Sequence, residues 1–364
     1  MATPVRSNVL RMHPYQPGKP ISAVQRELGL KKIVKLASNE NPLGPSPKAI
    51  AAVKSALSEV NRYPDGAAFE LKNALSVRFG IPMSQVIVGN GSDELIGNIG
   101  LALIDDLDDE VVTSEHSFTR YDAAADLAPC LLRKVRMTHD WRFDLSAIAA
   151  AINEHTKIVY IANPNNPTGT IVTRTELEAF LEDVPERVLV VLDEAYFEYA
   201  RANTDYPDGR EYVQRGMNVA ALRTFSKVYG LAGLRIGYGF VPEYLSHAID
   251  RVREPFDSNS LAQVAGLAAL KDDQHVRQSL DMNAEGLALL ELAIKREGCS
   301  VTRSFTNFHF VGLGRPAAPV FQALMKKGYI VRPVPDAPNH LRITVGTPEE
   351  NQGFIQAFRE VMGG

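Results

Sequence analysis

The chain has 364 residues, 45% of them hydrophobic and 23% charged, which is enough to bury a large core. Its net charge of -4, with both signs dispersed along the chain, argues against a surface built to bind nucleic acid. No stretch is apolar for long enough to cross a membrane, and residues 1–19 lack the apolar core of an export signal. Cys130 and Cys299 lie outside any metal-ligand spacing, so we expect reduced thiols, no metal site and a cytoplasmic protein.

Residues 1–44 are rich in proline and turn formers, with a short strand pattern at residues 33–36. We expect an N-terminal arm here that packs with a small domain. From residue 47 onwards, helical and strand patterns alternate. Helical periodicity occurs at residues 47–60, 67–79, 121–127, 144–153 and 175–182 and from residue 95, and strand patterns occur at residues 85–88, 110–113, 130–135, 157–162, 188–192, 219–222 and 236–240.

This alternation is typical of a mostly parallel sheet covered by helices on both faces. We therefore expect a large α/β domain over residues 45–245. After Pro242 the pattern changes to helices at residues 243–253, 261–270 and 273–296, separated strands at 307–311, 329–331 and 341–345, and a final helix from Pro348. This predicts a smaller α+β domain over residues 246–364.

Ligands of open α/β sheets collect at the carboxyl ends of the strands, and the first polar cluster at such an end is Gly89-Asn90-Gly91-Ser92-Asp93. Glycines allow a tight turn there, and the free N–H groups of the following helix favour a bound anion such as phosphate. A structural turn capped by Ser92 or Asp93 would explain the same residues equally well.

The second and third clusters follow two further strand patterns. Residues 163–169 read N-P-N-N-P-T-G, in which asparagine side chains could donate hydrogen bonds to a ligand, although ordinary loops use the same residue types. Asp193-Glu194-Ala195-Tyr196 follows a fully apolar strand, where an ionised aspartate is costly unless a cation balances it. Asp193 is therefore a candidate to hold a protonated ring nitrogen, or else a helix cap or part of a buried salt bridge.

The fourth cluster contains Lys227, in the stretch R-T-F-S-K-V-Y-G-L-A-G-L-R-I-G from Arg223 to Gly237. A lysine in a short turn fenced by apolar and glycine residues is a candidate nucleophile. Ser226 and the planar guanidinium of Arg235 could bind a phosphate. By itself, the stretch is as consistent with a surface turn between two strands.

Together, a reactive lysine, a carboxylate, an amide donor, a tyrosine and a phosphate cradle are what pyridoxal phosphate requires of a protein. The chain resembles the fold-type-I pyridoxal-phosphate aminotransferases of class I/II over essentially its whole length. It resembles most closely the histidinol-phosphate and the aromatic aminotransferases. The resemblance rests on seven motifs in this order: S-N-E-N-P-L-G-P-S-P, Y-P-D, G-S-D-E, N-P-N-N-P-T-G, D-E-A-Y, R-T-F-S-K and L-R-I-T-V-G.

The resemblance implies a role for each matching residue. Lys227 corresponds to the lysine that binds the cofactor covalently and moves the substrate proton, and Asp193 to the partner of the pyridine nitrogen. The other implied cofactor contacts are Asn166 and Tyr196 at the ring hydroxyl, Phe118 stacked on the ring, and Ser92, Asp93, Thr224, Ser226 and Arg235 at the phosphate. Gly230 and Gly233 are expected to leave room for close backbone packing.

The resemblance also implies substrate contacts and a partner. Arg342 corresponds to the arginine that binds the substrate carboxylate, and Arg332 to a second substrate arginine; Tyr15 and Asn39 would line the substrate side. Tyr63 corresponds to a residue that reaches the cofactor of the other subunit, which implies a homodimer with shared active sites. Asp257 replaces an asparagine often present in the family, which puts one edge of the pocket in doubt.

We therefore expect an enzyme that converts histidinol phosphate and 2-oxoglutarate to imidazole-acetol phosphate and glutamate in histidine biosynthesis. An aromatic amino acid aminotransferase, acting on phenylalanine or tyrosine, is the alternative. A pyridoxal-phosphate-dependent decarboxylase of a phosphorylated amino acid is a weaker one. A cofactor-binding protein without activity would not need both Lys227 and Arg342.

Overall fold

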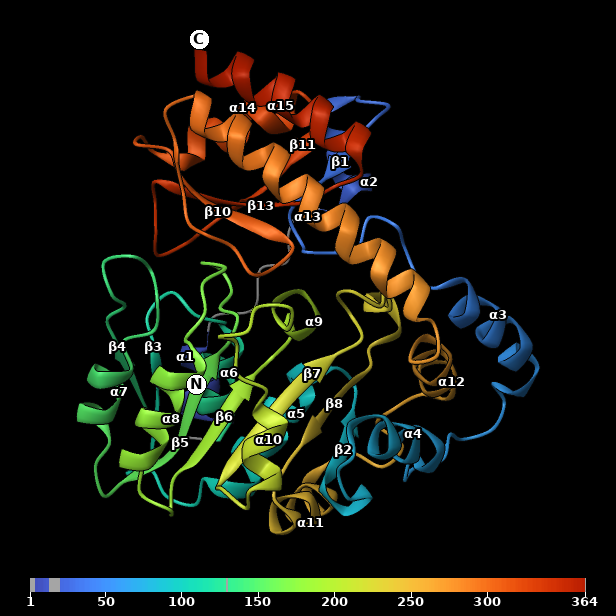
Figure 1. Ribbon diagram of the computed structural model, residues 1–364, viewed down its shortest axis with the longest axis vertical. Coiled ribbons are helices and arrows are strands. Elements are labelled where there is room, and N and C mark those ends of the chain that lie inside the picture. The colour runs from blue at the N-terminus through green and yellow to red at the C-terminus, as the bar shows by residue number, and fades with distance from the viewer. Residues whose placement is uncertain (1–3, 13–19, 129, 364) are drawn as a thin grey trace.

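A computed structural model describes residues 4–12, 20–128 and 130–363 of the chain, which form a large lower part and a smaller upper part in Figure 1. Over these described residues, the main sheet has seven strands in the order β2-β8-β7-β6-β5-β3-β4. The strands are β2 (Val86–Gly89), β3 (Glu110–Ser114), β4 (Leu131–Val135), β5 (Thr156–Ala162), β6 (Leu189–Asp193), β7 (Val219–Thr224) and β8 (Gly237–Phe240). β8 runs antiparallel to both neighbours, and the other pairings are parallel. The predicted fold class, a mostly parallel sheet covered by helices with a smaller α+β part, is confirmed.

Helices pack around this sheet, and all of β6 and β7 is buried, which explains their unbroken apolar runs. They are α3 (Pro47–Ala56), α4 (Phe69–Phe79), α5 (Ser92–Leu103), α6 (Arg120–Leu127), α7 (Leu145–Ala151), α8 (Arg174–Asp183), α9 (Phe197–Ala200), α10 (Gly209–Gln214), α11 (Glu243–Val252) and α12 (Ser260–Ala269). Short 3-10 turns lie at η1 (Leu57–Glu59), η2 (Met83–Gln85) and η3 (Ala232–Leu234). The helix starts follow from the sequence: Thr173 and Glu176 form a reciprocal capping box at α8.

The smaller part is built on an antiparallel sheet with the order β12-β13-β10-β9. Its strands are β9 (Ser300–Val301), β10 (Phe308–Gly312), β12 (Arg332–Pro333) and β13 (His340–Thr344), and its helices are α13 (Asp273–Arg296), α14 (Ala317–Lys326) and α15 (Pro348–Gly363). Two segments of the N-terminal arm, α2 (Ile21–Leu28) and β1 (Val34–Lys35), pack here, and β1 pairs in parallel with β11 (Tyr329–Ile330). The arm also reaches the large part, because Asn8 of α1 (Ser7–Arg11) donates from Nδ2 to the carbonyl of Asp126 at 2.6 Å.

The packing of α12 bears on the expected division of the chain into residues 1–44, 45–245 and 246–364. Ala262, Ala265 and Ala269 of α12 belong to the same buried cluster as the large sheet, and so does Val276 near the start of α13. Figure 1 shows α13 running from the large part into the small part. We therefore propose an arm, a large unit and a small unit with the second boundary inside α13 instead of at residue 245.

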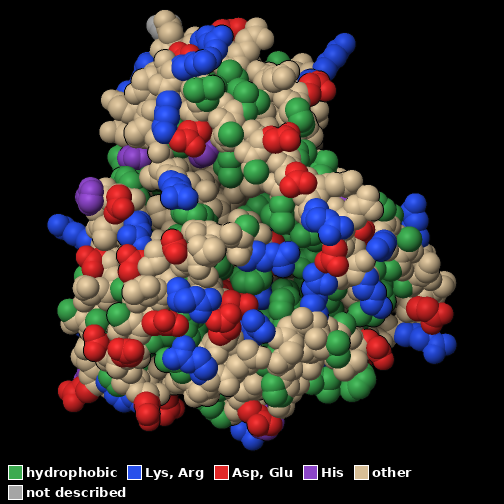
Figure 2. Space-filling model, viewed as in Figure 1, with side chains coloured by type: hydrophobic (Ala, Val, Ile, Leu, Met, Phe, Trp, Pro, Cys, Tyr) green, Lys and Arg blue, Asp and Glu red, His purple; other side chains and the backbone are tan. Residues whose placement is uncertain are grey.

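The surface matches the dispersed charge of the sequence. On the face drawn in Figure 2, acidic and basic side chains are interspersed over both parts. Within the described ranges, no helix is both long enough and apolar enough to cross a membrane.

Candidate active site

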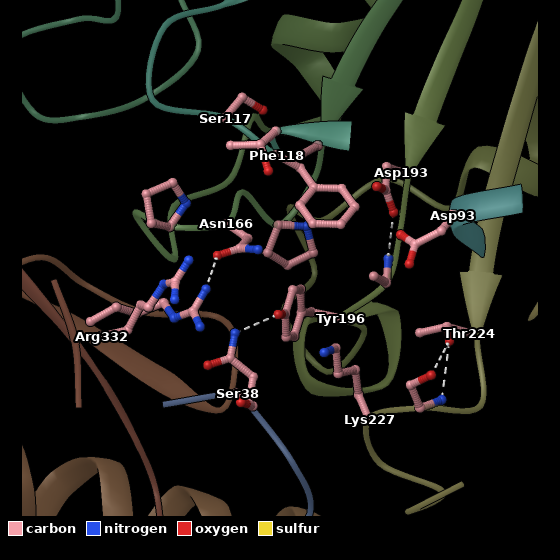
Figure 3. Close-up of a pocket in the computed structure, with 18 of the residues that line it drawn as sticks. Ser38, Asp93, Ser117, Phe118, Asn166, Asp193, Tyr196, Thr224, Lys227 and Arg332 are labelled. Atoms are coloured by element: carbon pink, nitrogen blue, oxygen red, sulfur yellow. Dashed lines mark hydrogen bonds between the residues drawn. The ribbon is translucent and has the colours of Figure 1, made fainter. Parts of the chain in front are cut away.

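A cavity of about 380 Å³ lies at the carboxyl ends of the parallel strands, where the small part faces the large sheet. This volume falls in the range of small-molecule sites. Thirteen of the residues singled out from the sequence line it: Asn39, Ser92, Asp93, Phe118, Asn166, Asp193, Tyr196, Thr224, Ser226, Lys227, Arg235, Arg332 and Arg342. Figure 3 shows many of them pointing toward one another from strands, loops and the arm.

Asp193 ends β6 as a buried carboxylate with two protein donors. The hydroxyl of Tyr121 donates to Oδ2 at 2.8 Å, and the backbone N–H of Ala195 donates to Oδ1 at 3.2 Å. Burial raises the pKa of Asp193 to about 6, although the Tyr121 hydrogen bond acts in the opposite direction. The site thus holds an acid that ionises near neutral pH and would gain from a cationic partner.

Asn166 and Tyr196 are each held by a residue from a distant segment. Arg342 on β13 donates from Nη1 to Asn166 Oδ1 and from Nη2 to the carbonyl of Ala37, both at 2.6 Å. Asn39 donates from Nδ2 to the hydroxyl of Tyr196 at 2.7 Å. These contacts join the arm, the N-P-N-N-P-T-G loop and the small sheet around one cavity (Figure 3).

Lys227 lies in the turn after β7, with Nζ 5.6 Å from the centre of the Tyr196 ring. Thr224 Oγ1 donates to Ser226 Oγ at 3.0 Å and accepts from the Ser226 N–H at 3.0 Å, which fixes the backbone before the lysine. Gly230 has a φ of +69°, and a Cβ there would collide with the carbonyl of Gly44, so the expected close packing is confirmed. The same expectation for Gly233 is wrong, because a Cβ there would meet nothing within 4 Å among the described atoms.

The start of α5 and Arg235 together form a cradle that suits an anion. Arg235 Nη2 lies 3.2 Å from Asp93 Oδ2, and a Cβ added at Gly91 would lie 2.5 Å from the same guanidinium nitrogen. Gly91 precedes the first turn of α5, whose free N–H groups and dipole attract negative charge. Glycine at this position therefore keeps the cradle open.

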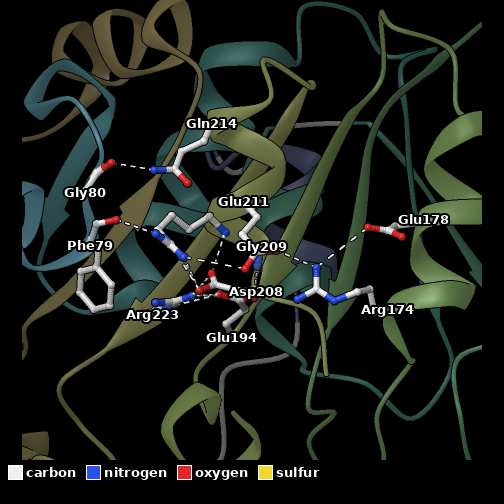
Figure 4. Close-up of polar contacts among 11 residues, drawn as sticks. Phe79, Gly80, Arg174, Glu178, Glu194, Asp208, Gly209, Glu211, Gln214 and Arg223 are labelled. Atoms are coloured by element: carbon white, nitrogen blue, oxygen red, sulfur yellow. Dashed lines mark hydrogen bonds and ion pairs between the residues drawn. The ribbon is translucent and has the colours of Figure 1, made fainter. Parts of the chain in front are cut away.

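An ion cluster lies on the side of β6 and β7 that carries α10, and Figure 4 shows its contacts. Arg223 is fully buried, with Nη2 2.6 Å from Asp208 Oδ1 and 2.8 Å from Glu194 Oε2. Its guanidinium also lies 3.3 Å from the centre of the Phe197 ring. Because Glu194 follows Asp193 and Arg223 precedes Thr224, the cluster joins the ends of the two strands that carry these pocket residues.

Three residues discussed from the sequence are placed outside the cavity or outside the described residues. Tyr63 is 83% exposed and stacks on Phe256 with ring centres 4.7 Å apart. Tyr15 lies outside the described residues. Asp257 is not among the described residues that line the cavity; its carboxylate is buried and pairs with Arg253 at 3.2 Å.

Sequence reasoning missed Tyr121, which it assigned only to a helical pattern. Its ring is fully buried, stacks on Tyr160 with centres 4.6 Å apart, and places the hydroxyl against Asp193. It also missed His116 and Ser117, although both stand beside Phe118 in the chain and line the cavity. No motif contains these residues, so only their position directly before Phe118 in the sequence could have indicated them.

The residues present fit pyridoxal phosphate. The anion cradle suits its phosphate, buried Asp193 suits a protonated ring nitrogen, and Lys227 lines the same cavity with its amine toward the Tyr196 ring (Figure 3). Fold and site together define a pyridoxal-phosphate-dependent enzyme of fold type I.

Comparisons with known proteins identify the family. The family described as aminotransferase class I and II matches residues 31–358. The histidinol-phosphate aminotransferase 2 of Carboxydothermus hydrogenoformans is 48% identical over 98% of this chain and 99% of its own length. The histidinol-phosphate aminotransferase of Akkermansia muciniphila is 46% identical over 98% of both chains.

Solved structures agree with this result. The histidinol-phosphate aminotransferase of Sinorhizobium meliloti, solved with pyridoxal-5'-phosphate, superposes with a TM-score of 0.91 at 28% identity and covers 100% of this chain and 98% of that one. The chain belongs to the class I and II aminotransferases. It is therefore a transaminase whose cofactor is pyridoxal phosphate, as the motifs predicted.

Proposed function

We propose that this enzyme transfers an amino group between histidinol phosphate and 2-oxoglutarate, giving imidazole-acetol phosphate and glutamate, as a step of histidine biosynthesis. The relatives that match over nearly the whole chain carry the name of this activity. The observation that carries the proposal is a pair of arginines, Arg332 and Arg342, that face each other in register on β12 and β13 and line one cavity with Lys227.

The two arginines suit a donor and an acceptor that both carry anionic groups. Arg342 is held by Asn166 and Ala37, so its planar guanidinium is already oriented before a substrate binds. We propose that it binds the carboxylate of glutamate or 2-oxoglutarate. Arg332 would then meet the side-chain carboxylate of glutamate, or the phosphate of histidinol phosphate, which has no carboxylate.

When bound, pyridoxal phosphate supplies an electron-withdrawing ring that makes the substrate Cα–H bond easier to break. In our proposal the Lys227 amine would hold the cofactor covalently at rest, and would afterwards move the substrate proton between Cα and C4′. Ionised Asp193 keeps the ring nitrogen protonated. Asn166 and Tyr196 would hydrogen-bond the ring hydroxyl, Phe118 would stack on the ring, and the phosphate would be held by Ser92, Asp93, Thr224, Ser226 and Arg235.

The N-terminal arm forms part of the pocket wall. Asn39 comes from the arm and holds the Tyr196 hydroxyl, so the arm closes one side of the cavity. Tyr15 is proposed to line this same substrate side. A dry pocket strengthens the contacts of both arginines with their anions.

We further propose that two copies form a homodimer in which Tyr63 reaches the cofactor phosphate of the partner subunit. Its exposed ring on Phe256 offers an apolar surface outside its own cavity. Mixing Tyr63→Phe subunits with inactive Lys227→Ala subunits tests this. If the site is shared, a mixed dimer contains one site with both Lys227 and Tyr63, so the mixture should be more active than either variant alone. Activity of a single subunit at full rate would contradict it.

The free thiols of Cys130 and Cys299 support the proposed cytoplasmic location.

The test of the substrate compares turnover of histidinol phosphate and phenylalanine with 2-oxoglutarate as acceptor. We expect kcat/KM to be higher for histidinol phosphate. A preference for phenylalanine would favour the aromatic aminotransferase, and release of carbon dioxide without a keto product would favour the decarboxylase.

A further inference from the structure

Four aromatic rings meet where the large and small parts approach each other beside the cavity. Trp141 from the large part lies at their centre, with its ring centre 5.1 Å from His116, 5.0 Å from Phe310 and 4.9 Å from His340. Phe310 and His340 belong to β10 and β13 of the small part and stack on each other at 4.5 Å. We name His116, Trp141, Phe310 and His340 the distal wall.

The distal wall borders the end of the cavity that carries the arginines. His116 itself lines the cavity, and Trp141 packs against the cluster of Phe310, Val334 and Ala337. Val334 also lines the cavity and lies two residues after Arg332. Trp141 thus fills the space behind two pocket residues that come from different parts of the molecule.

The backbone of this wall is held in an unusual conformation. His116 and Trp141 have φ values of +49° and +63°, in the left-handed region, which is uncommon for residues other than glycine and especially so for a bulky residue such as tryptophan. Such residues persist only where their surroundings fix them, and they concentrate at functional sites.

The N-P-N-N-P-T-G loop and Thr170, which follows it, provide the fixing contacts. Asn165 Nδ2 donates to the carbonyl of His116 at 3.0 Å, and Thr170 Oγ1 donates to the carbonyl of Trp141 at 2.7 Å. Thr168 Oγ1 joins the two, since it lies 2.8 Å from both Asn165 Nδ2 and Thr170 Oγ1. Because Asn165 precedes the Asn166 that accepts from Arg342, the wall and the substrate arginine are positioned by one loop.

The distal wall also contains two buried imidazole nitrogens that make no hydrogen bond within the described part of the chain. They are the Nδ1 atoms of His116 and His340. Of the four rings only that of His116 lines the cavity, and Trp141 meets it edge to face at 71° and supports it from behind. An imidazole held in this way suits a planar aromatic ring better than a short aliphatic chain.

We propose that Trp141 and His116 determine specificity for donors that carry an aromatic ring, by setting the shape of the cavity at its distal wall. The ring can be an imidazole or a phenyl group, so this inference deepens the proposed function and rests on it only for the identity of the ring. The contacts of a short donor such as glutamate depend on Arg332 and Arg342 and much less on this wall.

The test uses the holoenzyme with His116→Asn and Trp141→Asn, because asparagine tolerates the left-handed backbone and removes only the ring. His139→Asn is the matched control, since His139 is exposed and belongs to the same loop as Trp141. Single-turnover amino transfer is measured with histidinol phosphate, phenylalanine and glutamate as donors. The emission of Trp141, the one tryptophan of the chain, reports donor binding in the wild type and in His116→Asn.

We expect both variants to lose about 10- to 100-fold in kcat/KM with the ring-bearing donor that the wild type prefers, and less than about twofold with glutamate. In His116→Asn, the fluorescence midpoint should shift to higher concentration for that donor only. Equal losses with all donors, or unchanged kinetics, would overturn the proposal. If the wild type uses phenylalanine but not histidinol phosphate, the proposed substrate is wrong, while the wall is still judged with phenylalanine against glutamate. A wild type that uses glutamate but no ring-bearing donor overturns both.

Discussion

Replacing Tyr121 by phenylalanine should change the pH at which the cofactor binds. The substitution removes the hydroxyl that donates to buried Asp193 at 2.8 Å. A hydrogen bond to a charged group contributes about 1.5–3 kcal/mol, and one pKa unit corresponds to about 1.4 kcal/mol. The pKa of Asp193, raised by burial to about 6 in the wild type, should therefore rise by a further one to two units or so.

The consequence for cofactor affinity follows from the ionised fraction of Asp193. At pH 7 this fraction is about nine tenths in the wild type and about one tenth to one half in the variant, so the cofactor should bind about two- to tenfold more weakly. The affinity of the variant should recover at about pH 9, where Asp193 is ionised in both the wild type and the variant. The sign is opposite for the protein without cofactor: because folding raises the pKa above 3.8, the stability from this group is present below about pH 4 and is lost as the pH rises through 6.

Cofactor affinity can be titrated by absorbance between about pH 5 and about pH 9. Tyr160→Phe is the control. It removes a buried hydroxyl that donates to the carbonyl of Ile96 and not to Asp193, and it keeps the ring that stacks on Tyr121. The reasoning is refuted if Tyr121→Phe shows the same pH midpoint as the wild type and the control.

Three further predictions concern the lysine, the substrate arginine and the ion cluster. Lys227→Ala should lose turnover by more than about a thousandfold and lack the visible absorbance of covalently held cofactor, as a spectrum of the purified protein would show. Arg342→Lys should raise KM for glutamate by about 10- to 100-fold with a smaller change in kcat, measured by steady-state kinetics, because lysine cannot reproduce the planar fork. Arg223→Met should lower the free energy of unfolding by about 3–5 kcal/mol, because it leaves the buried Glu194 carboxylate without its cation. A denaturant titration measures this loss, and Arg174→Met is the control because Arg174 pairs with Glu211 at the half-exposed surface. The control should lower the free energy of unfolding by less than about 1 kcal/mol, and an equal loss in both variants would contradict the argument.

The long periodic patterns were the most predictable part of the fold. The helical pattern at residues 273–296 coincides with α13, and the strand pattern at residues 188–192 falls within one residue of β6. The helix contains enough turns for its period to stand out, and the strand is marked by an unbroken apolar run. The four-residue α9, the six-residue α10 and the two-residue strands β9 and β12 were missed, because so few residues carry no readable period.

The site was predictable only where a motif carried the information. Arg342 and Asn166 stand 176 residues apart, and the resemblance assigned both to one site, although it did not predict the hydrogen bond between them. The contact of Tyr121 with Asp193 spans 72 residues and belongs to no motif, so nothing in the sequence marked it. The left-handed backbone of Trp141 was equally invisible, since tertiary hydrogen bonds and not local propensity maintain it.

The close approach of Gly44 to Gly230 has a consequence for the order of assembly. Asn41 donates from Nδ2 to the carbonyl of Val228 and to Ser279 Oγ, both at 2.8 Å, so the lysine turn is braced by a segment from the start of the chain and by α13. Contacts this distant in sequence form late, after their loops have closed. A ribosome must therefore release almost the entire polypeptide, through β13, before the lysine pocket is complete, and cofactor capture marks the end of folding instead of its nucleus.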